Sequence, residues 1–305
     1  MGNILSKDAM YGDIEELSNV YGGLKDYTKY IITSDTDSIF VVLQDFVDKE
    51  DLNEVGKICG GIENFLNNKI VLGVVKKHQV NVDVNKLRLK NELVCKRGVF
   101  ISKKHYALNI VKREEKLVNE IKIVGIETQR SDYPALTKQY LKVLLDMMLS
   151  SDSISIVEIL DFIDVKEKEF IQKIKAGDKE VARPSSFGKK LTEYKKIPQN
   201  VVSMLNWNDL MYNYFLPGTK GYLFKLLGLD KDIAPKDVVE KYYKNFETKN
   251  RKLETISIPE NESNLPKWFI PDIKAMVKFS WIDRYTQLTE PLTSTKTQEY
   301  TWDDE

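Results

Sequence analysis

Two aspartates separated by one residue are the part of this sequence best suited to chemistry. Asp35 and Asp37 lie in a polar Ser-Asp-Thr-Asp-Ser run at residues 34–38, between two apolar runs rich in β-branched residues. Such runs predict strands, and the polar residues between them predict a tight turn. Both carboxylates would then lie on one face of a hairpin tip, where they repel each other unless a cation neutralises them. Hard oxygen ligands at such a position suit Mg²⁺, which usually takes one or two carboxylates together with substrate phosphates.

A second polar group lies in the sequence LRLKNELVCKRGVFISKKHYAL at residues 87–108. Lysines on the edge of a strand, such as Lys103 and Lys104, can reach the minor groove and backbone of a DNA duplex. Every base pair offers acceptors there in a degenerate pattern, which suits a protein that must hold any sequence. Taken alone, this lysine pair is more typical of an ordinary solvated surface.

Together these segments resemble family B DNA polymerases. The strand–Asp-Thr-Asp-Ser–strand run is similar to that family's motif C hairpin, YGDTDS, with Thr33 and Ser34 in place of its Tyr and Gly. Residues 87–108 resemble a hairpin of the family whose first strand carries a buried-end glutamate, here Glu92, and whose second strand ends in KKRYA. His105 replaces the arginine of that run.

Three later segments extend the resemblance over nearly the whole chain. IKIVGIETQRSDYP at 121–134 is similar to the passage from palm to thumb in the branch found in tailed bacteriophages. RPSSFGKK at 183–190 is similar to a serine-rich thumb loop, followed by Tyr194, in which hydroxyls, free backbone N–H groups and lysines would clamp phosphates. Residues 266–292 resemble the last thumb helices. The DNA-binding residues that the resemblance implies are Lys103, Lys104, Tyr106, Arg130, Ser131, Ser185, Ser186, Lys189 and Lys190.

The resemblance implies DNA-templated DNA synthesis from primer–template DNA and deoxynucleoside triphosphates by two-metal catalysis. Asp35 and Asp37 would be the catalytic residues and would hold two Mg²⁺ ions. Thr36 would contact the incoming nucleotide, and Glu92 would be a supporting acid.

Two signatures of the family are missing from the sequence. These are the motif A carboxylate in its D-x-x-S-L-Y-P-S run and the fingers helix with K-x-x-x-N-S-x-Y-G. The run Ser-Asn-Val-Tyr-Gly at 18–22 resembles the second only superficially, because Ser and Asn are exchanged and the lysine is absent. We therefore expect a second polypeptide to supply motif A, fingers and exonuclease, so that this chain is the palm and thumb subunit of a split polymerase.

The composition predicts a folded chain of two domains. Its 305 residues are 42% hydrophobic and 30% charged, and it has no apolar run of transmembrane length. With two cysteines, Cys59 and Cys95, neither a disulfide framework nor a structural zinc site is expected. The expected location is cytoplasmic, in an infected host cell if the gene belongs to a phage. The net charge of zero is a mild argument against non-specific DNA binding, so local clusters of lysine carry that function instead.

The predicted fold class is α+β. An antiparallel palm sheet with helices is expected over residues 1–130, with hairpins at 29–43 and 87–111. A mostly helical thumb is expected over 131–292, followed by a flexible tail at 293–305 that is a candidate for binding a sliding clamp. The sequence predicts helices over 1–20, 45–77 (broken at 60–61), 134–149, 154–176 and after 198, strand-rich stretches at 80–111 and 120–127, a strand at 221–229, two late helices, and core aromatics over 212–222.

Two alternatives remain open. The chain could be a non-catalytic accessory subunit that binds primer–template DNA, or a polymerase remnant that keeps the shape of palm and thumb. A nucleotide-sugar transferase could also use an Asp-x-Asp pair to hold a metal and a diphosphate. That reading leaves the KKHYA hairpin and the thumb-like half unexplained.

Overall fold

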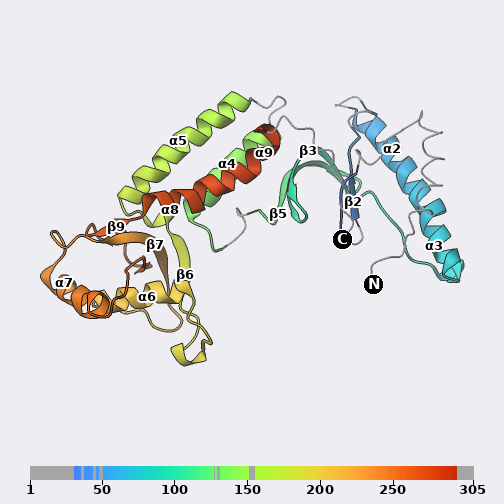
Figure 1. The fold of residues 1–305 in the computed structure, drawn as a ribbon. Coiled ribbons are helices and arrows are strands. Elements are labelled where there is room, and N and C mark those ends of the chain that lie inside the picture. The colour runs from blue at the N-terminus through green and yellow to red at the C-terminus, as the bar shows by residue number, and fades with distance from the viewer. Residues whose placement is uncertain are drawn as a thin grey trace. The chain divides into compact units, whose positions relative to one another are not determined.

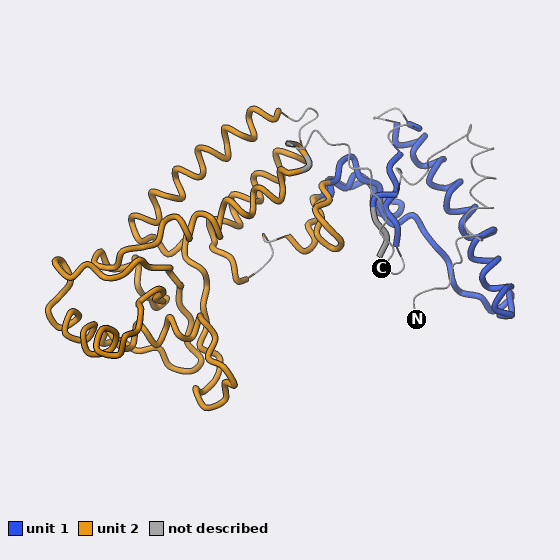
Figure 2. Tube along the Cα trace, in the orientation of Figure 1, with its two compact units in different colours: residues 1–98, 108–120 blue, residues 99–107, 121–305 orange. Residues whose placement is uncertain are grey.

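The protein forms two compact units, one from residues 1–98 and 108–120 and the other from 99–107 and 121–305 (Figure 2). Each contains both helices and strands (Figure 1), which confirms the α+β class. The computed structural model describes residues 31–35, 38–43, 46–47, 51–126, 128, 131–150 and 155–293.

The first unit contains the predicted aspartate hairpin. Strand β1 (Ile31–Asp35) pairs antiparallel with β2 (Ser38–Val41), and Asp35 lies opposite Ser38. The hairpin prediction is therefore confirmed for the backbone of these strands. The helix predicted over residues 1–20 lies outside the described residues.

A long helical stretch follows in the first unit. Helix α2 (Leu52–Phe65) begins at Asp51, whose carboxylate accepts hydrogen bonds from the backbone N–H groups of Asn53 and Glu54 at 2.8 and 3.1 Å. A wider π turn (Leu66–Val71) then leads into α3 (Leu72–Lys77). The break predicted at Gly60 and Gly61 is wrong, because a glycine inside a helix costs only about 1 kcal/mol and the surrounding turns offset that.

The π turn positions an asparagine that holds the chain on its way to the next sheet. The Asn67 side chain donates to the carbonyl of Leu89 and accepts from its N–H, both at 2.8 Å. The Glu63 carboxylate accepts from the N–H of Asn91 at 3.1 Å. Leu89 and Asn91 therefore find hydrogen-bond partners in helix side chains, and residues 82–84 form a short 3₁₀ turn. Residues 80–92 form no strand, so that part of the strand prediction is wrong.

Three consecutive strands form the next sheet, in the order β3-β4-β5. They are β3 (Leu93–Ser102), β4 (His105–Arg113) and β5 (Lys116–Val124), and two-residue connections make the neighbours antiparallel. Ala107, Leu108 and Ile110 of β4 are buried. The strand predictions for 93–111 and 120–124 are confirmed, and the boundary between the two units crosses this sheet.

Helices pack together in the second unit. Helix α4 (Ala135–Ser150) buries Leu141, Leu144, Leu145 and Met148 on one stripe, as its apolar period predicts. Helix α5 (Ile156–Lys175) lies against it, and so does α9 (Asp283–Thr293), which follows α8 (Ile273–Val277) and a π turn (Lys278–Ile282) (Figure 1). The helices predicted at 134–149 and 154–176 are confirmed.

The end of α5 is fixed by glycine and by charge. Gly177 has φ +72°, a left-handed conformation that stops the helix as predicted. Hydrogen bonds to Asp178 and Glu180 raise the pKa of Lys173. Burial alone would raise the pKa of Asp178, but its hydrogen bonds with Lys173 and the Glu180 N–H lower it below its ordinary value.

The second unit also contains a four-stranded antiparallel sheet. Strand β7 (Lys220–Leu229) pairs with β6 (Arg183–Ser186) on one edge, with β8 (Thr255–Pro259) on the other, and with β9 (Phe269–Pro271) near its end. The sequence predicted β7 but missed the other three strands, and it assigned residues 183–186 to a loop. Strands of three to five residues, each containing a proline, carry too little periodicity to be recognised.

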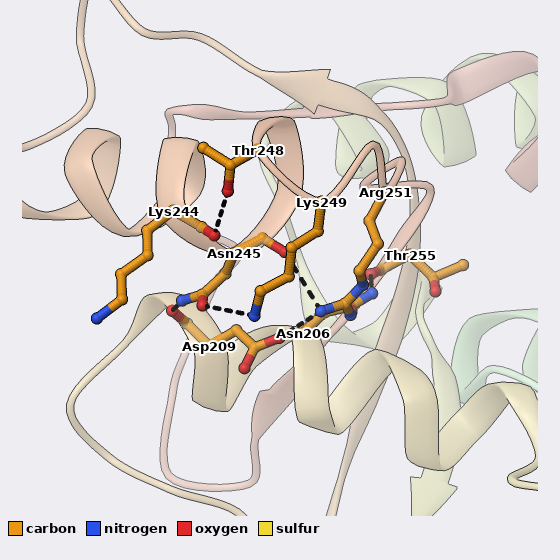
Figure 3. A network of polar contacts seen from close by, with 8 residues as sticks. All are labelled: Asn206, Asp209, Lys244, Asn245, Thr248, Lys249, Arg251 and Thr255. Atoms are coloured by element: carbon orange, nitrogen blue, oxygen red, sulfur yellow. Dashed lines mark hydrogen bonds and ion pairs between the residues drawn. The ribbon is translucent and has the colours of Figure 1, made fainter.

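A polar network holds the helices beside this sheet (Figure 3). Helix α6 (Gln199–Leu210) packs on β8, and α7 (Lys236–Tyr242) continues through a π turn (Tyr243–Glu247) into a loop. From that loop, Arg251 donates to Asp209 and to Asn206, both at 2.9 Å. Asn206 is buried and donates in turn to the carbonyl of Thr255 at 2.7 Å.

Replacing Arg251 tests whether this network stabilises the second unit. Arg251→Met removes the donor to the buried Asn206 oxygen, and an unsatisfied buried acceptor costs about 1–3 kcal/mol. We expect a loss of that size in the free energy of unfolding, measured by chemical denaturation. The exposed neighbour Lys252 provides the matched control, since Lys252→Met should change the unfolding free energy by less than about 0.5 kcal/mol. Equal effects of both variants would contradict the assignment.

Candidate nucleic-acid interface

The aspartate hairpin has a tight connection between its two strands. Because Asp35 pairs with Ser38, only Thr36 and Asp37 lie between the paired positions, which is the length of the shortest common hairpin loop. Thr36, Asp37 and the side chain of Asp35 lie outside the described residues. In the part of the chain that the structure describes, no three His, Cys, Asp or Glu side chains come together to hold a metal ion. Metal binding by Asp35 and Asp37 stays a prediction.

The two lysines of the KKHYA run form the turn between β3 and β4. Both Lys103 and Lys104 are exposed, and Lys104 has φ +65°. The expectation that this run ends the second strand is wrong, since it forms the turn and begins that strand. The Nδ1 atom of His105 lies 3.0 Å from the Lys103 carbonyl oxygen and 3.1 Å from the Ser102 hydroxyl, so the ring fastens the turn. Behind it, the Tyr106 ring is half-buried and lies 5.7 Å from that of Phe100.

Gly125 lies directly against this turn. A Cβ atom at Gly125 would lie 2.1 Å from the Lys104 carbonyl oxygen and 2.9 Å from Cδ2 of His105. Only glycine fits this contact, and its φ of +70° also favours glycine. The structure therefore brings together two sequence segments that were predicted separately to contact DNA, the lysine turn and residues 121–134. Within the second segment Ser131 is exposed, and Arg130 lies outside the described residues.

Glu92 does not join the lysines. It immediately precedes β3, whereas Lys103 follows the other end of that strand. Ten residues of strand span about 33 Å at roughly 3.3 Å per residue. The Glu92 side chain is exposed, which does not match a buried-end glutamate, and its carbonyl accepts from the N–H of Glu114 at 2.8 Å.

An arginine connects residues 121–134 with the serine-rich segment. Nε of Arg183, on β6, donates to the carbonyl of Asp132 at 3.2 Å. Its Nη2 atom lies 3.6 Å from the Asp132 carboxylate. The segment that follows β5 is thus bound to β6, the edge strand of the four-stranded sheet.

Next to this contact lies a group of cations and aromatic rings, which we call the Phe279 cluster. The rings of Tyr133 and Phe279 stack with centroids 5.7 Å apart and an interplanar angle of 2°. Around Phe279, the charged groups of Arg183, Lys225 and Arg284 lie 5.5, 5.9 and 5.6 Å from the ring centroid. These are cation–π distances, each contributing roughly 0.5–1 kcal/mol at exposed sites.

The Phe279 cluster has an excess of positive charge. It contains three cations, and the Asp132 carboxylate is the acid bound to one of them. Concentrated positive charge attracts a polyanion such as the DNA backbone. Sequence reasoning missed Lys225, Phe279 and Arg284, because they come from β7, a π turn and α9 and share no local motif.

The serine-rich segment divides into buried and exposed parts. Ser185 is buried, and its hydroxyl lies 3.0 Å from that of Ser257, so it supports the sheet and faces no solvent. Ser186, Lys189 and Lys190 are exposed. The N–H of Lys189 donates to the Tyr194 hydroxyl at 3.1 Å, so it is not a free phosphate donor as the sequence suggested.

The family model of DNA polymerase family B matches residues 7–207. The chain belongs to DNA polymerase family B. Among curated proteins no match is found. Membership in this polymerase family makes DNA and deoxynucleoside triphosphates the substrates and DNA synthesis the activity to which the chain contributes. None of the described helices is long and apolar enough to cross a membrane.

The family match and the Phe279 cluster overlap only in part. Tyr133 and Arg183 lie within the matched residues, and Lys225, Phe279 and Arg284 lie beyond them. The polymerase segment therefore uses side chains from the remainder of the second unit to complete its positive surface.

Replacing Gly125 tests the contact between the lysine turn and β5. Gly125→Ala should lower the free energy of unfolding by roughly 2–4 kcal/mol, from the left-handed backbone and the overlap with the Lys104 carbonyl. Gly188→Ala is the control, because a Cβ at Gly188 meets nothing within 4 Å. Chemical denaturation measures both, and a Gly125→Ala protein as stable as the control variant would contradict the contact.

Removing one charge of the Phe279 cluster tests its role in DNA binding. Lys225→Gln should weaken binding of duplex DNA and lower the slope of log K against log salt by about 0.9, the value for one phosphate contact. Fluorescence anisotropy at several salt concentrations measures this slope, and Lys225→Arg should restore it.

The control for Lys225 is an exposed lysine on α5. Lys168→Gln changes the net charge by the same amount, but Lys168 is paired with Asp164 at 2.6 Å and lies outside the cluster. If Lys168→Gln and Lys225→Gln lower the salt slope equally, overall charge explains the effect and the cluster does not.

Proposed function

We propose that this chain is the palm and thumb part of a family B DNA polymerase whose opposing acid, fingers and exonuclease come from a partner polypeptide. Its Asp35–Asp37 hairpin would carry the motif C side of the active site. The single observation that supports this most strongly is the family match over residues 7–207, which includes that hairpin and most of the predicted DNA-contacting segments. Residues 121–134 support a relationship to polymerases of tailed bacteriophages.

The donor set at the hairpin fits magnesium. Two carboxylates separated by one residue of the sequence supply the hard oxygen ligands that Mg²⁺ prefers. When bound, two Mg²⁺ ions would lower the pKa of the primer 3′-hydroxyl and neutralise the triphosphate and leaving pyrophosphate. Asp37 and Asp35 would hold these ions, and Thr36 would contact the incoming nucleotide.

The two aspartates of this hairpin would supply only one side of a two-metal active site. Two-metal nucleotidyl transfer needs acidic ligands on both sides of the metals, and the sequence contains no motif A run to supply the second side. This reasoning supports a partner that brings the motif A aspartate together with fingers and exonuclease.

The remaining residues would hold the primer–template. Lys103 and Lys104 at the exposed turn, with Tyr106 behind them, would contact the primer end of the duplex. Exposed groups beyond the turn would follow the phosphate backbone, and these are Ser131, Ser186, Lys189, Lys190 and the cations of the Phe279 cluster. Arg130 belongs to the same proposal. Because the net charge of the chain is zero, these local concentrations of positive charge would provide the DNA affinity.

One observation keeps a second candidate function in view. The cations of the Phe279 cluster can attract the DNA backbone without a metal ion. A non-catalytic subunit that binds primer–template DNA would need nothing more. Clamp binding by residues 293–305 is a further proposal, and residues 294–305 lie outside the described part of the chain.

Primer extension distinguishes catalysis from binding. The chain is mixed with a candidate partner that carries motif A, and extension of a labelled primer is followed with Mg²⁺. Asp37→Asn should lower the rate by at least about 100-fold, the usual cost of removing one group that stabilises charge in the transition state. Primer–template affinity, measured in EDTA, should change by less than about 2-fold, since the carboxylates do not hold the DNA.

An exposed aspartate far along the sequence serves as the control. Asp83 lies in a short turn at residues 82–84, and Asp83→Asn should retain full extension. Unchanged activity of the Asp37→Asn protein would falsify the catalytic role, and extension by the chain alone would refute the need for a partner.

A further inference from the structure

Two tyrosines stand out on the surface of the second unit. Tyr212 and Tyr214 are 71% and 59% exposed, in the segment between α6 and β7. The sequence predicted the aromatic residues at 212–222 as core, which is right for Phe215, 3% exposed, and wrong for these two tyrosines. An exposed aromatic ring on a folded protein is an unused stacking surface.

The backbone around Tyr214 is held on both sides. Before it, the indole Nε1 of Trp207 donates to the carbonyl of Asn213 at 2.8 Å. After it, the Asn208 side chain accepts from the N–H of Phe215 at 2.7 Å and donates to its carbonyl at 2.9 Å. The Tyr214 ring is therefore presented from a fixed loop, which reduces the entropy lost when a ligand stacks on it.

Tyr214 borders an open pocket of about 580 Å³. The polar lining comes from Asn213, Thr219, Lys220, Glu260 and Asn261. Gly218 lines it as well, and a Cβ at that position would meet nothing within 4 Å, so this wall is open to a ligand. The pocket combines the rings of Tyr214 and of the buried Phe215, two side-chain amides and one charge of each sign.

We propose that this pocket binds an unpaired base of single-stranded DNA, stacked on Tyr214. Stacking on an aromatic ring suits every base, because each has a π face. The amides of Asn213 and Asn261 offer the donors and acceptors that pair with base edges. This inference rests on the proposed function, since a polymerase chain that holds a primer–template also meets unpaired template.

The charges of the pocket distinguish it from the positive surface described above. Lys220 and Glu260 both line it, so their charges offset each other. The side-chain Nδ2 atom of Asn213 donates to Glu262 at 3.4 Å. The side-chain oxygen Oδ1 of Asn213 is then the atom that would accept a hydrogen bond from a base. Recognition here depends on the base and little on the phosphate, so binding should depend weakly on salt.

A comparison of two labelled strands separates base from backbone. Anisotropy titrations of the full chain use fluorescein-labelled oligo(dT) and an abasic oligonucleotide of the same length, which has the phosphates without the bases. The native chain should bind oligo(dT) more tightly. Tyr214→Ala should weaken oligo(dT) binding roughly 5- to 100-fold, as alanine substitution of a stacking residue does, and leave abasic binding unchanged. Tyr214→Phe should keep the preference for oligo(dT).

Tyr212 provides the matched control in the same loop. The centroid of its ring lies 3.3 Å from Nζ of Lys241, and a hydrogen bond to Asp237 raises the pKa of its hydroxyl. Tyr212 therefore already contacts groups of the protein itself. Tyr212→Ala should retain the preference for oligo(dT), and circular dichroism should show that all variants fold.

Three outcomes would overturn the inference. They are no preference of the native chain for oligo(dT), equal effects of Tyr212→Ala and Tyr214→Ala, or loss of the preference in Tyr214→Phe. The last result would indicate hydrogen bonding to another kind of ligand, such as a peptide or a sugar. Failure of the proposed polymerase function appears separately, as absence of primer extension with a partner, and does not affect the strand comparison.

Discussion

The positive surface of this protein depends on a contact that leaves no room for a side chain. Where β5 ends, the backbone of Gly125 passes the carbonyl of Lys104 so closely that a methyl group would overlap it. This contact holds the end of β5 against the turn between β3 and β4. Farther along the chain, Asp132 accepts from Arg183 on β6, and the ring of Tyr133 stacks on Phe279. One glycine thus allows two backbones to approach next to the segment that joins this surface.

Charge on this protein is arranged locally. A chain with 46 basic and 46 acidic residues has no general attraction for DNA. Many of its ion pairs are exposed, like those of α5, and contribute little to stability. The Phe279 cluster differs because its three cations also face an aromatic ring, whose negative face attracts them without cancelling their charge. Cations gathered in this way concentrate positive charge at one place, which is what a DNA-holding surface requires.

The sequence was most informative where periodicity was long or a motif was dense. The apolar stripe of α4 and the Gly177 stop after α5 predicted those helices, and the two apolar runs around the Ser-Asp-Thr-Asp-Ser segment predicted the hairpin. Prediction from the sequence failed where contacts with residues distant in the sequence determine the local structure. Leu89 and Asn91 lie in a segment that looks like a strand but bond to the side chains of Asn67 and Glu63. Ser185 looks like a loop hydroxyl but pairs with Ser257 across the sheet. Lys103 and Lys104 were recognised as candidate DNA-binding residues, although they were expected on a strand and lie in a turn. Lys225 and Arg284 could not be recognised, because no local pattern connects them.

The π turn at 278–282 has a consequence for how this surface can change in evolution. A π turn amounts to one additional residue inserted into a helix. Here it carries Phe279 and directly precedes α9, whose Arg284 Nε donates back to the Phe279 carbonyl at 3.3 Å. Deleting a single residue from this turn would rotate the following helix by about 100° relative to α8, and Arg284 would leave the ring. A relative could therefore keep all three cations and still lose the cluster through a change in length alone.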